Sequence, residues 1–396
     1  MNQTLESLID KFGNPKAVIN SNKSGFKKVV FDFEEIICLD SNGIITINGK
    51  PTESKGLEAW QKQIDIFKKN SSSNDVACIG FFSYDFKNYI YKKNKFKKLK
   101  KNIPLFWFGK PKNTLEISFK DFKELKQKIA MKQKLERLNK YTDKINNIKD
   151  RLFKGDVYQI NYTQPIKYDF NGDTFQLFMQ ISKEAEPIFG SYLDIGTIQI
   201  LSFSPEKFFV KKGDCLKSYP IKGTIQRLKK EDNKNINKLK KSKKDQAEHL
   251  MIVDLLRNDI GKVSKFGTVK ANGLFSVKTF KTIHHMETEI EGRLKNNIIE
   301  SNIIEALFPG GSITGAPKKK AVEIIDSIEE YNRGIYTGCI GSINGNGDMD
   351  FNICIRTMVV QNNIAEYGVG GGIVWDSQPK LEYLEAQEKA NILKNL

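Results

Sequence analysis

A lysine and a glutamate are the two residues of this sequence best placed to act together on a small molecule. Lys222 lies in Tyr219-Pro220-Ile221-Lys222-Gly223-Thr224, an apolar and glycine-flanked setting in a chain otherwise rich in solvated lysines. Upstream, two short β-like runs flank Gly213-Asp214, which is typical of a hairpin turn. This hairpin would fold Glu206 back towards Lys222, with Cβ atoms about 5–8 Å apart. A carboxyl and an amine would then flank one bound molecule.

The register of this hairpin leaves two interpretations open. A shift of one residue would send the side chains of Glu206 and Lys222 to opposite faces. A simple ion pair across the two strands would also explain the pattern. A lysine is a nucleophile only in its uncharged form, so the catalytic interpretation requires burial or nearby cations.

Two predicted helices carry carboxylates that could bind a metal ion. Glu248 lies in the first turn of a helix predicted over 245–259, where the helix dipole favours a negative charge. Glu382, Glu385 and Glu388 recur every third residue in a second helix, predicted over 381–396. Glu248 and Glu385 could together bind Mg²⁺, which prefers oxygen ligands. The alternatives are dipole balance for Glu248 and solvated pairing of Glu385 with Lys389.

A glycine-rich stretch from Phe308 to Lys318 indicates an anion site. It precedes an apolar helix predicted over 321–328, with Pro317 suited to the first helical position. Backbone N–H groups at such a helix start can bind an anion, but the spacing does not fit a nucleotide phosphate loop. Lys318 to Lys320 lie where the helix dipole disfavours cations, and a bound anion would offset that.

The last third of the chain is rich in β-like runs, at 336–343, 351–360 and 365–374. Arg356 lies in the middle of the second run, where an unpaired charge would be costly. Its planar guanidinium matches a carboxylate with two hydrogen bonds. Gly370 to Gly372 either let backbone N–H groups approach a ligand or simply turn the chain.

Composition indicates a globular, cytoplasmic protein. The 396 residues are 39% hydrophobic, which is enough for a large core. Five scattered cysteines without a CxxC pair argue against disulfides and zinc, and favour a reducing compartment. No apolar run approaches the ~18 residues of a membrane span, and the first residues lack a signal-peptide pattern. Export and membrane insertion are therefore not expected.

The net charge of +17 raises nucleic acid as a partner. Much of this charge lies in two lysine runs, at 92–101 and 229–244, and such runs are usually solvated loops or helix faces. Neither contains a nucleic-acid recognition motif. A basic nucleic-acid-binding protein is kept as the alternative from another class, although a positive field would also attract a small polyanion.

The order of the elements predicts an α+β fold in two parts. Residues 1–125 alternate β-like runs (27–33, 43–47, 76–84 and 103–108) with one helix at 57–69, which predicts an N-terminal β-rich lobe. Residues 120–153 have helical spacing, so one or two helices should lead into the second part, 130–396. A strand then follows in which Gln159 and Asn161 share one face, either as substrate contacts or as the wet side of a sheet.

The motifs, taken in order, resemble those of the chorismate-utilising enzymes, which include the large subunits of anthranilate and aminodeoxychorismate synthase and, as relatives, isochorismate and salicylate synthases. The resemblance covers residues 130–396, and residues 1–125 match only loosely, through 79–85. It implies antiparallel β-sheets flanked by helices. No tryptophan-binding pattern is apparent in the N-terminal part. The matching segments are GDVYQIN, SPEKFF, PIKGT, AEHLMIVDLLRNDIGKV, FPGGSITGAPK, GIYTGCIG, CIRTM and GGGIVWDS, followed by ExxExxxKA.

The resemblance implies roles for particular residues. Lys222 would add covalently to C2 of chorismate, Glu206 would be the general acid, and Glu248 and Glu385 would hold Mg²⁺. His285 is implied as a third catalytic residue, but the sequence around it, His285-Met286-Glu287-Thr288, departs from the family pattern. The residues implied in chorismate binding are Gly223, Thr224, Thr314, Tyr336, Arg356, Gly370, Gly371, Gly372 and Lys389.

The PIKGT segment resembles the aminodeoxychorismate synthase branch, whereas anthranilate synthases usually carry PIAGT. This branch implies conversion of chorismate and ammonia to 4-amino-4-deoxychorismate, for para-aminobenzoate and folate biosynthesis. No glutaminase nucleophile loop of the GxCxG type is present in the sequence. A heterodimer with a separate glutamine amidotransferase is therefore expected. Anthranilate synthase is the alternative within the family.

Overall fold

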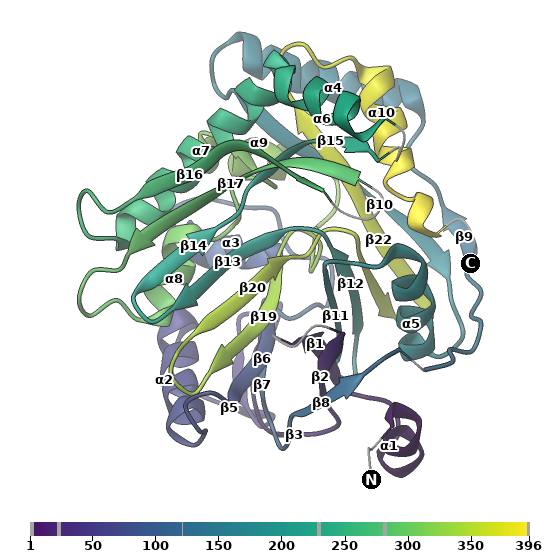
Figure 1. Ribbon diagram of the computed structural model, residues 1–396, viewed down its shortest axis with the longest axis vertical. Coiled ribbons are helices and arrows are strands. Elements are labelled where there is room, and N and C mark those ends of the chain that lie inside the picture. The colour runs from purple at the N-terminus through teal and green to yellow at the C-terminus, as the bar shows by residue number, and fades with distance from the viewer. Residues whose placement is uncertain (1–3, 22–24, 121, 228–230, 280–282, 394–396) are drawn as a thin grey trace.

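Two antiparallel β-sheets form the centre of the computed structural model, and helices cover their outer faces (Figure 1). The structure describes residues 4–21, 25–120, 122–227, 231–279 and 283–393, without the side chains of Thr224, Gln226 and Lys244. The two sheets pack against each other through one buried cluster, which contains Ile200 from one sheet and Ile340 from the other. This arrangement confirms the predicted α+β class.

Sheet A has ten strands, in the order β18 (Gly315–Ala316), β10 (Gln159–Asp169), β22 (Ile364–Ile373), β21 (Thr357–Gln361), β12 (Gln199–Ser204), β11 (Phe189–Asp194), β1 (Ala17–Asn20), β2 (Phe26–Val30) and β8 (Leu115–Ser118), with β9 (Ala130–Gln133) paired to β10. Sheet B has twelve, in the order β15 (Ile221–Gln226), β17 (Ile283–Arg293), β14 (Cys215–Ser218), β13 (Lys207–Lys212), β20 (Met349–Ile353), β19 (Cys339–Asn344), β6 (Val76–Phe82), β7 (Phe106–Pro111), β3 (Phe33–Leu39), β4 (Ile45–Ile47) and β5 (Lys50–Pro51), with β16 (Lys270–Thr279) paired to β17.

The helices are α1 (Leu5–Phe12), α2 (Gly56–Lys69), α3 (Lys87–Ile90), α4 (Leu138–Phe153), α5 (Thr174–Ala185), α6 (Asp232–Lys241), α7 (Lys243–Val263), α8 (Glu300–Leu307), α9 (Lys318–Ile328) and α10 (Pro379–Glu388), with two 3₁₀ turns, η1 (Tyr84–Phe86) and η2 (Asn391–Leu393). Among the described residues, no helix is both long and apolar enough to cross a lipid bilayer.

Strands from the first 125 residues are built into both sheets. In sheet A, β1 pairs with β11, and in sheet B, β6 pairs with β19. Each of these pairs joins an N-terminal strand to one from the remainder of the chain. The division of the chain near residues 125–130 stays a prediction.

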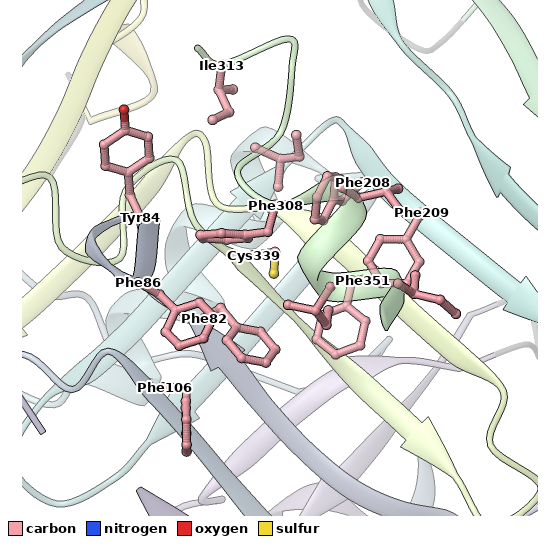
Figure 2. Close-up of a cluster of buried hydrophobic side chains, with 14 of the residues drawn as sticks. Phe82, Tyr84, Phe86, Phe106, Phe208, Phe209, Phe308, Ile313, Cys339 and Phe351 are labelled. Atoms are coloured by element: carbon pink, nitrogen blue, oxygen red, sulfur yellow. The ribbon is translucent and has the colours of Figure 1, made fainter. Parts of the chain in front are cut away.

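An aromatic core supports the glycine-rich segment (Figure 2). Phe82 and Phe86 contact Phe308, with ring centroids 6.1 and 5.9 Å apart, and all three side chains are buried. Phe308 immediately precedes the glycine-rich loop, so this packing fixes where the loop begins. Ring pairs of this kind stabilise a core beyond their buried area.

Several predicted elements are wrong in extent. The helical pattern predicted over 120–153 forms a helix only from Leu138, and β9 lies before it. Much of the lysine run at 229–244 is helical, as α6 and the start of α7, although 228–230 lie outside the described residues. The strand predicted over 351–360 is two strands, β20 and β21, with Arg356 between them. The helices α1 and α8 and the hairpin of β16 with β17 were not predicted from the sequence.

Candidate active site

The side chain of Lys222 lies close to the end of strand β22 and the start of strand β10. A Cβ atom added to Gly372 would lie 3.1 Å from Lys222 Nζ and 2.8 Å from Gln159 Nε2. The side chain of Gln159 is fully buried, and neither its amide oxygen nor its amide nitrogen has a hydrogen-bond partner within the described chain. A buried amide with two unsatisfied groups costs free energy unless a ligand pairs with it. A glycine at 372 therefore leaves room for a polar ligand between these two side chains.

Glu206 is a buried carboxyl near this lysine. Only 7% of the residue is exposed, and its Oε1 accepts a hydrogen bond of 2.6 Å from Ser312 Oγ in the glycine-rich loop. Burial raises the pKa of Glu206 to about 7, although the Ser312 hydrogen bond and the positive charge of Lys222 both oppose the rise. A carboxyl group that is half protonated at neutral pH can serve as a general acid.

The predicted hairpin is confirmed, but Glu206 and Lys222 are not cross-strand partners in it, because Lys222 lies on β15, which pairs with β17. Strands β13 and β14 pair with Lys212 opposite Cys215, and Pro220 separates β14 from β15. Both β14 and β15 then pair with β17. Among the described residues, no ion pair joins Glu206 to Lys222, and the carboxyl group accepts a hydrogen bond from Ser312 instead.

The glycine-rich loop lies against the start of β10. A Cβ atom at Gly315 would come within 2.0 Å of the Gln159 carbonyl oxygen, and the φ angle of this residue is +143°, so glycine is required. Thr314 is fully buried, and its hydroxyl donates to the Gly310 carbonyl oxygen at 2.8 Å. In this structure the Thr314 side chain braces the loop, and its implied role in binding chorismate stays a prediction.

A histidine that the sequence analysis did not single out lies close to Lys222. His249 follows Glu248 in α7 and is fully buried, with Nε2 2.7 Å from Thr288 Oγ1. Burial, and then the charge of Lys222, lower the pKa of His249 to about 4, so its ring is neutral at pH 7. Its Nδ1 atom has no hydrogen-bond partner within the described ranges.

The predicted catalytic His285 lies on β17, next to the residue opposite Lys222. It is 1% exposed, and its Nε2 lies 3.7 Å from Glu287 Oε2. On the neighbouring strand, Thr224 pairs with His285 through the backbone, but the Thr224 side chain lies outside the described part of the structure. The catalytic role of His285 stays a prediction.

The carboxylates of α10 converge on the neighbouring glycine of β22. A Cβ atom at Gly371 would lie 3.6 Å from both Glu382 Oε2 and Glu385 Oε1, and 3.5 Å from Lys389 Nζ. Lys389 Nζ also lies 2.7 Å from Glu385 Oε1 and donates to the Gly370 carbonyl oxygen at 2.6 Å. Gly371 directly precedes Gly372, so this polar group and the one around Lys222 are contacted by successive residues of β22.

Arg356 has an unusual backbone conformation, and its side chain contacts the C-terminal end of α10. Its φ angle is +50°, in a region that side chains other than glycine adopt rarely, and its Nη1 donates to the Lys389 carbonyl oxygen. The prediction that it lies within a strand is therefore wrong, because the chain passes at this residue from β20 of sheet B to β21 of sheet A. Such strained residues are concentrated at functional sites.

Tyr336 packs against β22 close to Arg356. A Cβ atom at Gly368 would lie 2.3 Å from the Tyr336 ring, so glycine at 368 makes room for this tyrosine. Burial raises the pKa of Tyr336, and the charge of Arg356 acts in the opposite direction. The implied substrate residues Tyr336 and Arg356 are thus neighbours in the structure.

The two predicted metal ligands lie on different helices. Glu248 is half-buried on α7, whereas Glu385 lies on α10. The described residues contain no group of three acidic, histidine or cysteine side chains close enough to hold a metal ion. The oxygens of Glu382 and Glu385 do converge, and two such carboxylates suit the coordination chemistry of Mg²⁺.

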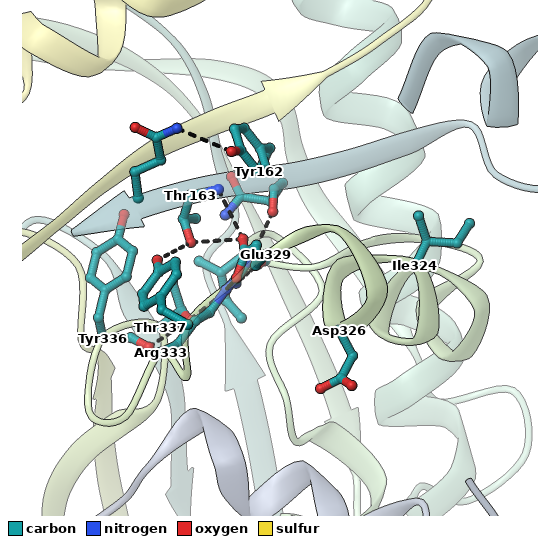
Figure 3. A network of polar contacts seen from close by, with 12 residues as sticks. Tyr162, Thr163, Ile324, Asp326, Glu329, Arg333, Tyr336 and Thr337 are labelled. Atoms are coloured by element: carbon teal, nitrogen blue, oxygen red, sulfur yellow. Dashed lines mark hydrogen bonds and ion pairs between the residues drawn. The ribbon is translucent and has the colours of Figure 1, made fainter. Parts of the chain in front are cut away.

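A buried ion pair holds the loop, β10 and α9 together (Figure 3). Arg333 donates to both carboxylate oxygens of Glu329, at 2.8 and 2.9 Å, and to the carbonyl oxygens of Ile313 and Asn161. The amide and hydroxyl groups of Thr163 both donate to Glu329 Oε1. This network was not predicted, because its members come from three separate parts of the sequence.

Lys318 does not contribute to an anion site. Its side chain is 7% exposed and pairs with Asp259 Oδ2 of α7 at 2.5 Å. It also donates to the Leu307 carbonyl oxygen at 2.7 Å. The Asp259 carboxylate therefore offsets the unfavourable position of Lys318 at the start of α9, and no bound anion is needed there.

The sequence matches the family model described as chorismate binding enzyme over residues 15–395. The Aminodeoxychorismate synthase component 1 of Escherichia coli (strain K12) is 43% identical over 259 residues, which are 65% of this chain and 57% of that protein. The Anthranilate synthase component 1 of Saccharolobus solfataricus is 35% identical over 258 residues, which are 65% of this chain and 61% of that protein. The chain thus spans less than two thirds of the length of these relatives.

Among solved structures, anthranilate synthase component I from Streptococcus pneumoniae TIGR4 superposes with a TM-score of 0.83. The match covers 94% of this chain and 93% of that chain, at 23% sequence identity. At this identity the likeness shows a shared fold.

Proposed function

The chain belongs to the chorismate-binding enzyme family, and from this premise we propose that it converts chorismate and ammonia to 4-amino-4-deoxychorismate. The names of its relatives support this activity, and so does the PIKGT segment around Lys222. The observation that carries the proposal is the position of Lys222 Nζ beside a buried, readily protonated carboxyl group and an unsatisfied amide. These groups supply a nucleophile, an acid and a hydrogen-bonding partner close to Gly372.

The first step forms a bond between Lys222 Nζ and C2 of chorismate. Both ring double bonds shift, from C1=C2 and C5=C6 to C1=C6 and C4=C5, the bond from C4 to its hydroxyl breaks, and the protonated Glu206 gives its proton to the leaving oxygen, which departs as water. Protonation of the leaving group by a positioned acid is worth about 10²–10⁴-fold in rate. The lysine is thereby covalently attached to the ring, and Glu206 is a carboxylate.

The second step forms a bond between ammonia and C4. Both double bonds shift back, the bond between C2 and Lys222 Nζ breaks, and one proton released from the ammonia nitrogen returns to Glu206. Chorismate and ammonia thus give 4-amino-4-deoxychorismate and water, with the enolpyruvyl group retained. Gln159 would pair with a polar group of the reactants, since its amide nitrogen and oxygen have no hydrogen-bond partner among the described residues.

Most of the remaining site residues are proposed to neutralise the negative charges of chorismate. Chorismate carries two carboxylates, and Arg356 with the backbone N–H groups of Gly370 to Gly372 would bind one of them. Mg²⁺, when bound, would neutralise the other, held by Glu248 and Glu385 with Glu382 nearby. Gly223, Thr224, Thr314, Tyr336 and Lys389 remain proposed contacts of the substrate.

The rate of the reaction should depend on the protonation of Glu206. Because the acid is needed in its protonated form, kcat/KM for chorismate should fall as the pH rises through about 7, the pKa of Glu206. The Ser312 hydrogen bond favours the charged carboxylate, so Ser312→Ala should raise this pKa and move the alkaline limb to higher pH. The measurement is a pH–rate profile at a constant concentration of uncharged ammonia.

The matched control for this profile is Ser327→Ala, whose hydroxyl donates to the Ile324 carbonyl oxygen outside the site. Ser327→Ala should leave the pH of the alkaline limb unchanged. Glu206→Gln should abolish the limb and slow turnover by about 10²–10⁴-fold. An alkaline limb that stays in place in both Ser312→Ala and Glu206→Gln would contradict the assignment of the acid.

The metal requirement should depend on both proposed ligands. Glu248→Gln and Glu385→Gln should each raise the Mg²⁺ concentration for half-maximal activity by about 10-fold or more, because each removes a charged oxygen ligand. Glu388→Gln, on an exposed position of the same helix as Glu385, is the control. Calorimetric Mg²⁺ titration measures the same loss directly. Unchanged metal affinity in both variants would favour dipole balance and solvated pairing for these carboxylates.

The ammonia is proposed to come from glutamine, through a separate amidotransferase subunit. An assay with purified chain, chorismate, Mg²⁺ and ammonium tests the activity without that partner. Consumption of chorismate should require ammonium. Consumption without ammonium would favour an isochorismate or salicylate synthase. Tight, salt-sensitive DNA binding without turnover of chorismate would favour the nucleic-acid alternative.

A further inference from the structure

One nitrogen of a fully buried histidine has no partner in the part of the chain that the structure describes. His249 of α7 is 0% exposed, and its Nε2 lies 2.7 Å from Thr288 Oγ1, whereas its Nδ1 has no hydrogen-bond partner among the described residues. A buried polar atom without a partner costs free energy, so it needs an explanation. The reaction steps proposed for Lys222 and Glu206 do not involve this ring.

The hydroxyl of Thr288 determines which nitrogen of His249 carries the proton. Thr288 is 1% exposed, and its Oγ1 accepts a hydrogen bond of 3.3 Å from the backbone N–H of Phe275. Within the described chain, His249 Nε2 is the only acceptor for the hydrogen of this hydroxyl. Burial favours the neutral ring, in which one nitrogen is an acceptor and the other is a donor. Nε2 is therefore the acceptor, and the unpaired Nδ1 carries the proton.

Thr288 and Lys222 project from the same face of sheet B. Lys222 pairs with Met286, so these two side chains lie on one face, and Thr288 follows two residues later on β17. Diagonal neighbours of this kind lie about 7–8 Å apart. Ile290, two residues further along β17, belongs to the buried cluster that includes the apolar stripe of α7. This face of β17 is therefore the one that α7 covers, and His249 lies there beside Lys222.

We propose that His249 Nδ1 donates a hydrogen bond to the ring carboxylate of bound chorismate, an inference that rests on the proposed function. In that function Lys222 adds to C2 of the ring, and the ring carboxylate is attached to C1, the neighbouring carbon. A donor beside Lys222 therefore lies on the side of the ring that carries this carboxylate. Hydrogen bonds to a carboxylate are among the stronger ones in proteins. Thr288 is a positioning residue, because its hydroxyl keeps the proton on Nδ1.

The tautomer is measured by nitrogen-15 NMR of a chain labelled in its histidines, of which the sequence has three. The signals of His249 are those that disappear in His249→Asn. In the native chain without chorismate, Nδ1 should have the chemical shift of a protonated nitrogen, and Nε2 that of an unprotonated one. Thr288→Val should mix the two tautomers, whereas Thr288→Ser keeps the hydroxyl and should preserve the native one. Saturation with chorismate, without ammonium, should move the Nδ1 resonance.

Three substitutions of His249 separate the donor from the packing of the ring. His249→Phe removes both nitrogens and should raise KM for chorismate by about 10–100-fold, because a hydrogen bond to a charged group is lost. The value of kcat should stay close to native, because the bond is made equally before and during the reaction. His249→Asn places an amide N–H where Nδ1 lies and should restore most of the native KM. His249→Gln places its amide near the position of Nε2 and should not restore it.

A proton on Nε2 in the native chain would overturn this inference. An Nδ1 resonance that stays unchanged while calorimetry shows chorismate bound would do so as well, and so would equal KM values in His249→Phe and the native chain. A chain that binds no chorismate would contradict the proposed function and, with it, the acceptor assigned to Nδ1. Release of anthranilate would contradict only the proposed product and leave this hydrogen bond standing, because both reactions begin with the same ring carboxylate.

Discussion

Lys222→Ala is expected to reduce ammonium-dependent turnover of chorismate by at least about 10³-fold, because it removes the proposed nucleophile while leaving the fold intact. Lys222 Nζ lies close to Gly372 and makes no hydrogen bond or ion pair with another described residue, so its removal should cost little stability. Turnover is measured by loss of chorismate, and unfolding by circular dichroism. The native chain should also yield a lysine-linked mass adduct after rapid denaturation in the presence of chorismate.

The matched control for this experiment is Lys212→Ala, which removes an exposed lysine at the hairpin turn. It should turn over chorismate at the native rate and form the same adduct. Near-native turnover in Lys222→Ala would eliminate the covalent mechanism, and the membership of the family would still stand. A mass adduct on a lysine other than 222 would reassign the nucleophile.

Arg333→Met is expected to lower the free energy of unfolding by about 3–5 kcal/mol, because it leaves the carboxylate of Glu329 buried without its cation. Arg333 and Glu329 are 2% and 4% exposed. The arginine also satisfies the carbonyl oxygens of Ile313 and Asn161, so its loss should loosen the glycine-rich loop that carries Ser312. Urea unfolding followed by circular dichroism measures this change.

Arg293→Met provides the comparison, since Arg293 pairs with Asp214 at the surface, where both side chains are more than half exposed. Exposed ion pairs contribute little to stability, so this variant should unfold close to the native midpoint. Equal midpoints for Arg333→Met and the native chain would show that the buried ion pair does not hold the loop in place.

The parts of the site that lie within short segments could be predicted from the sequence. The hairpin before Lys222 is encoded by two β-like runs and a turn, so local pattern sufficed to bring Glu206 near the lysine. The partner of Glu206 could not be predicted in this way. Ser312 lies 106 residues further along the chain, and only tertiary packing brings the two together.

Burial decides the other features that the sequence did not predict. Gln159 was predicted as a substrate contact or a solvated residue, and its complete burial with both amide groups unsatisfied favours the first interpretation. His249 was hidden within the apolar pattern of α7, because a histidine there has no periodicity that distinguishes it from its neighbours. The left-handed conformation of Arg356 likewise has no signature in the residue type, so a continuous strand was predicted there.

The arrangement of charge explains why the site is divided between two faces of β22. Gly372 faces the lysine and Gly371 faces the carboxylates of α10, so adjacent residues of one strand reach a nucleophile and a prospective metal site. Side chains alternate along a strand, so glycine at both positions removes the side chain that would otherwise fill the space on each side of β22.

The most direct test of the account is to identify the product by mass spectrometry after incubation of the purified chain with chorismate, Mg²⁺ and ammonium. The account predicts 4-amino-4-deoxychorismate, in which nitrogen has replaced the 4-hydroxyl group and the enolpyruvyl side chain is intact. Release of pyruvate together with anthranilate would contradict it and assign the chain to the other ammonia-dependent branch of the family.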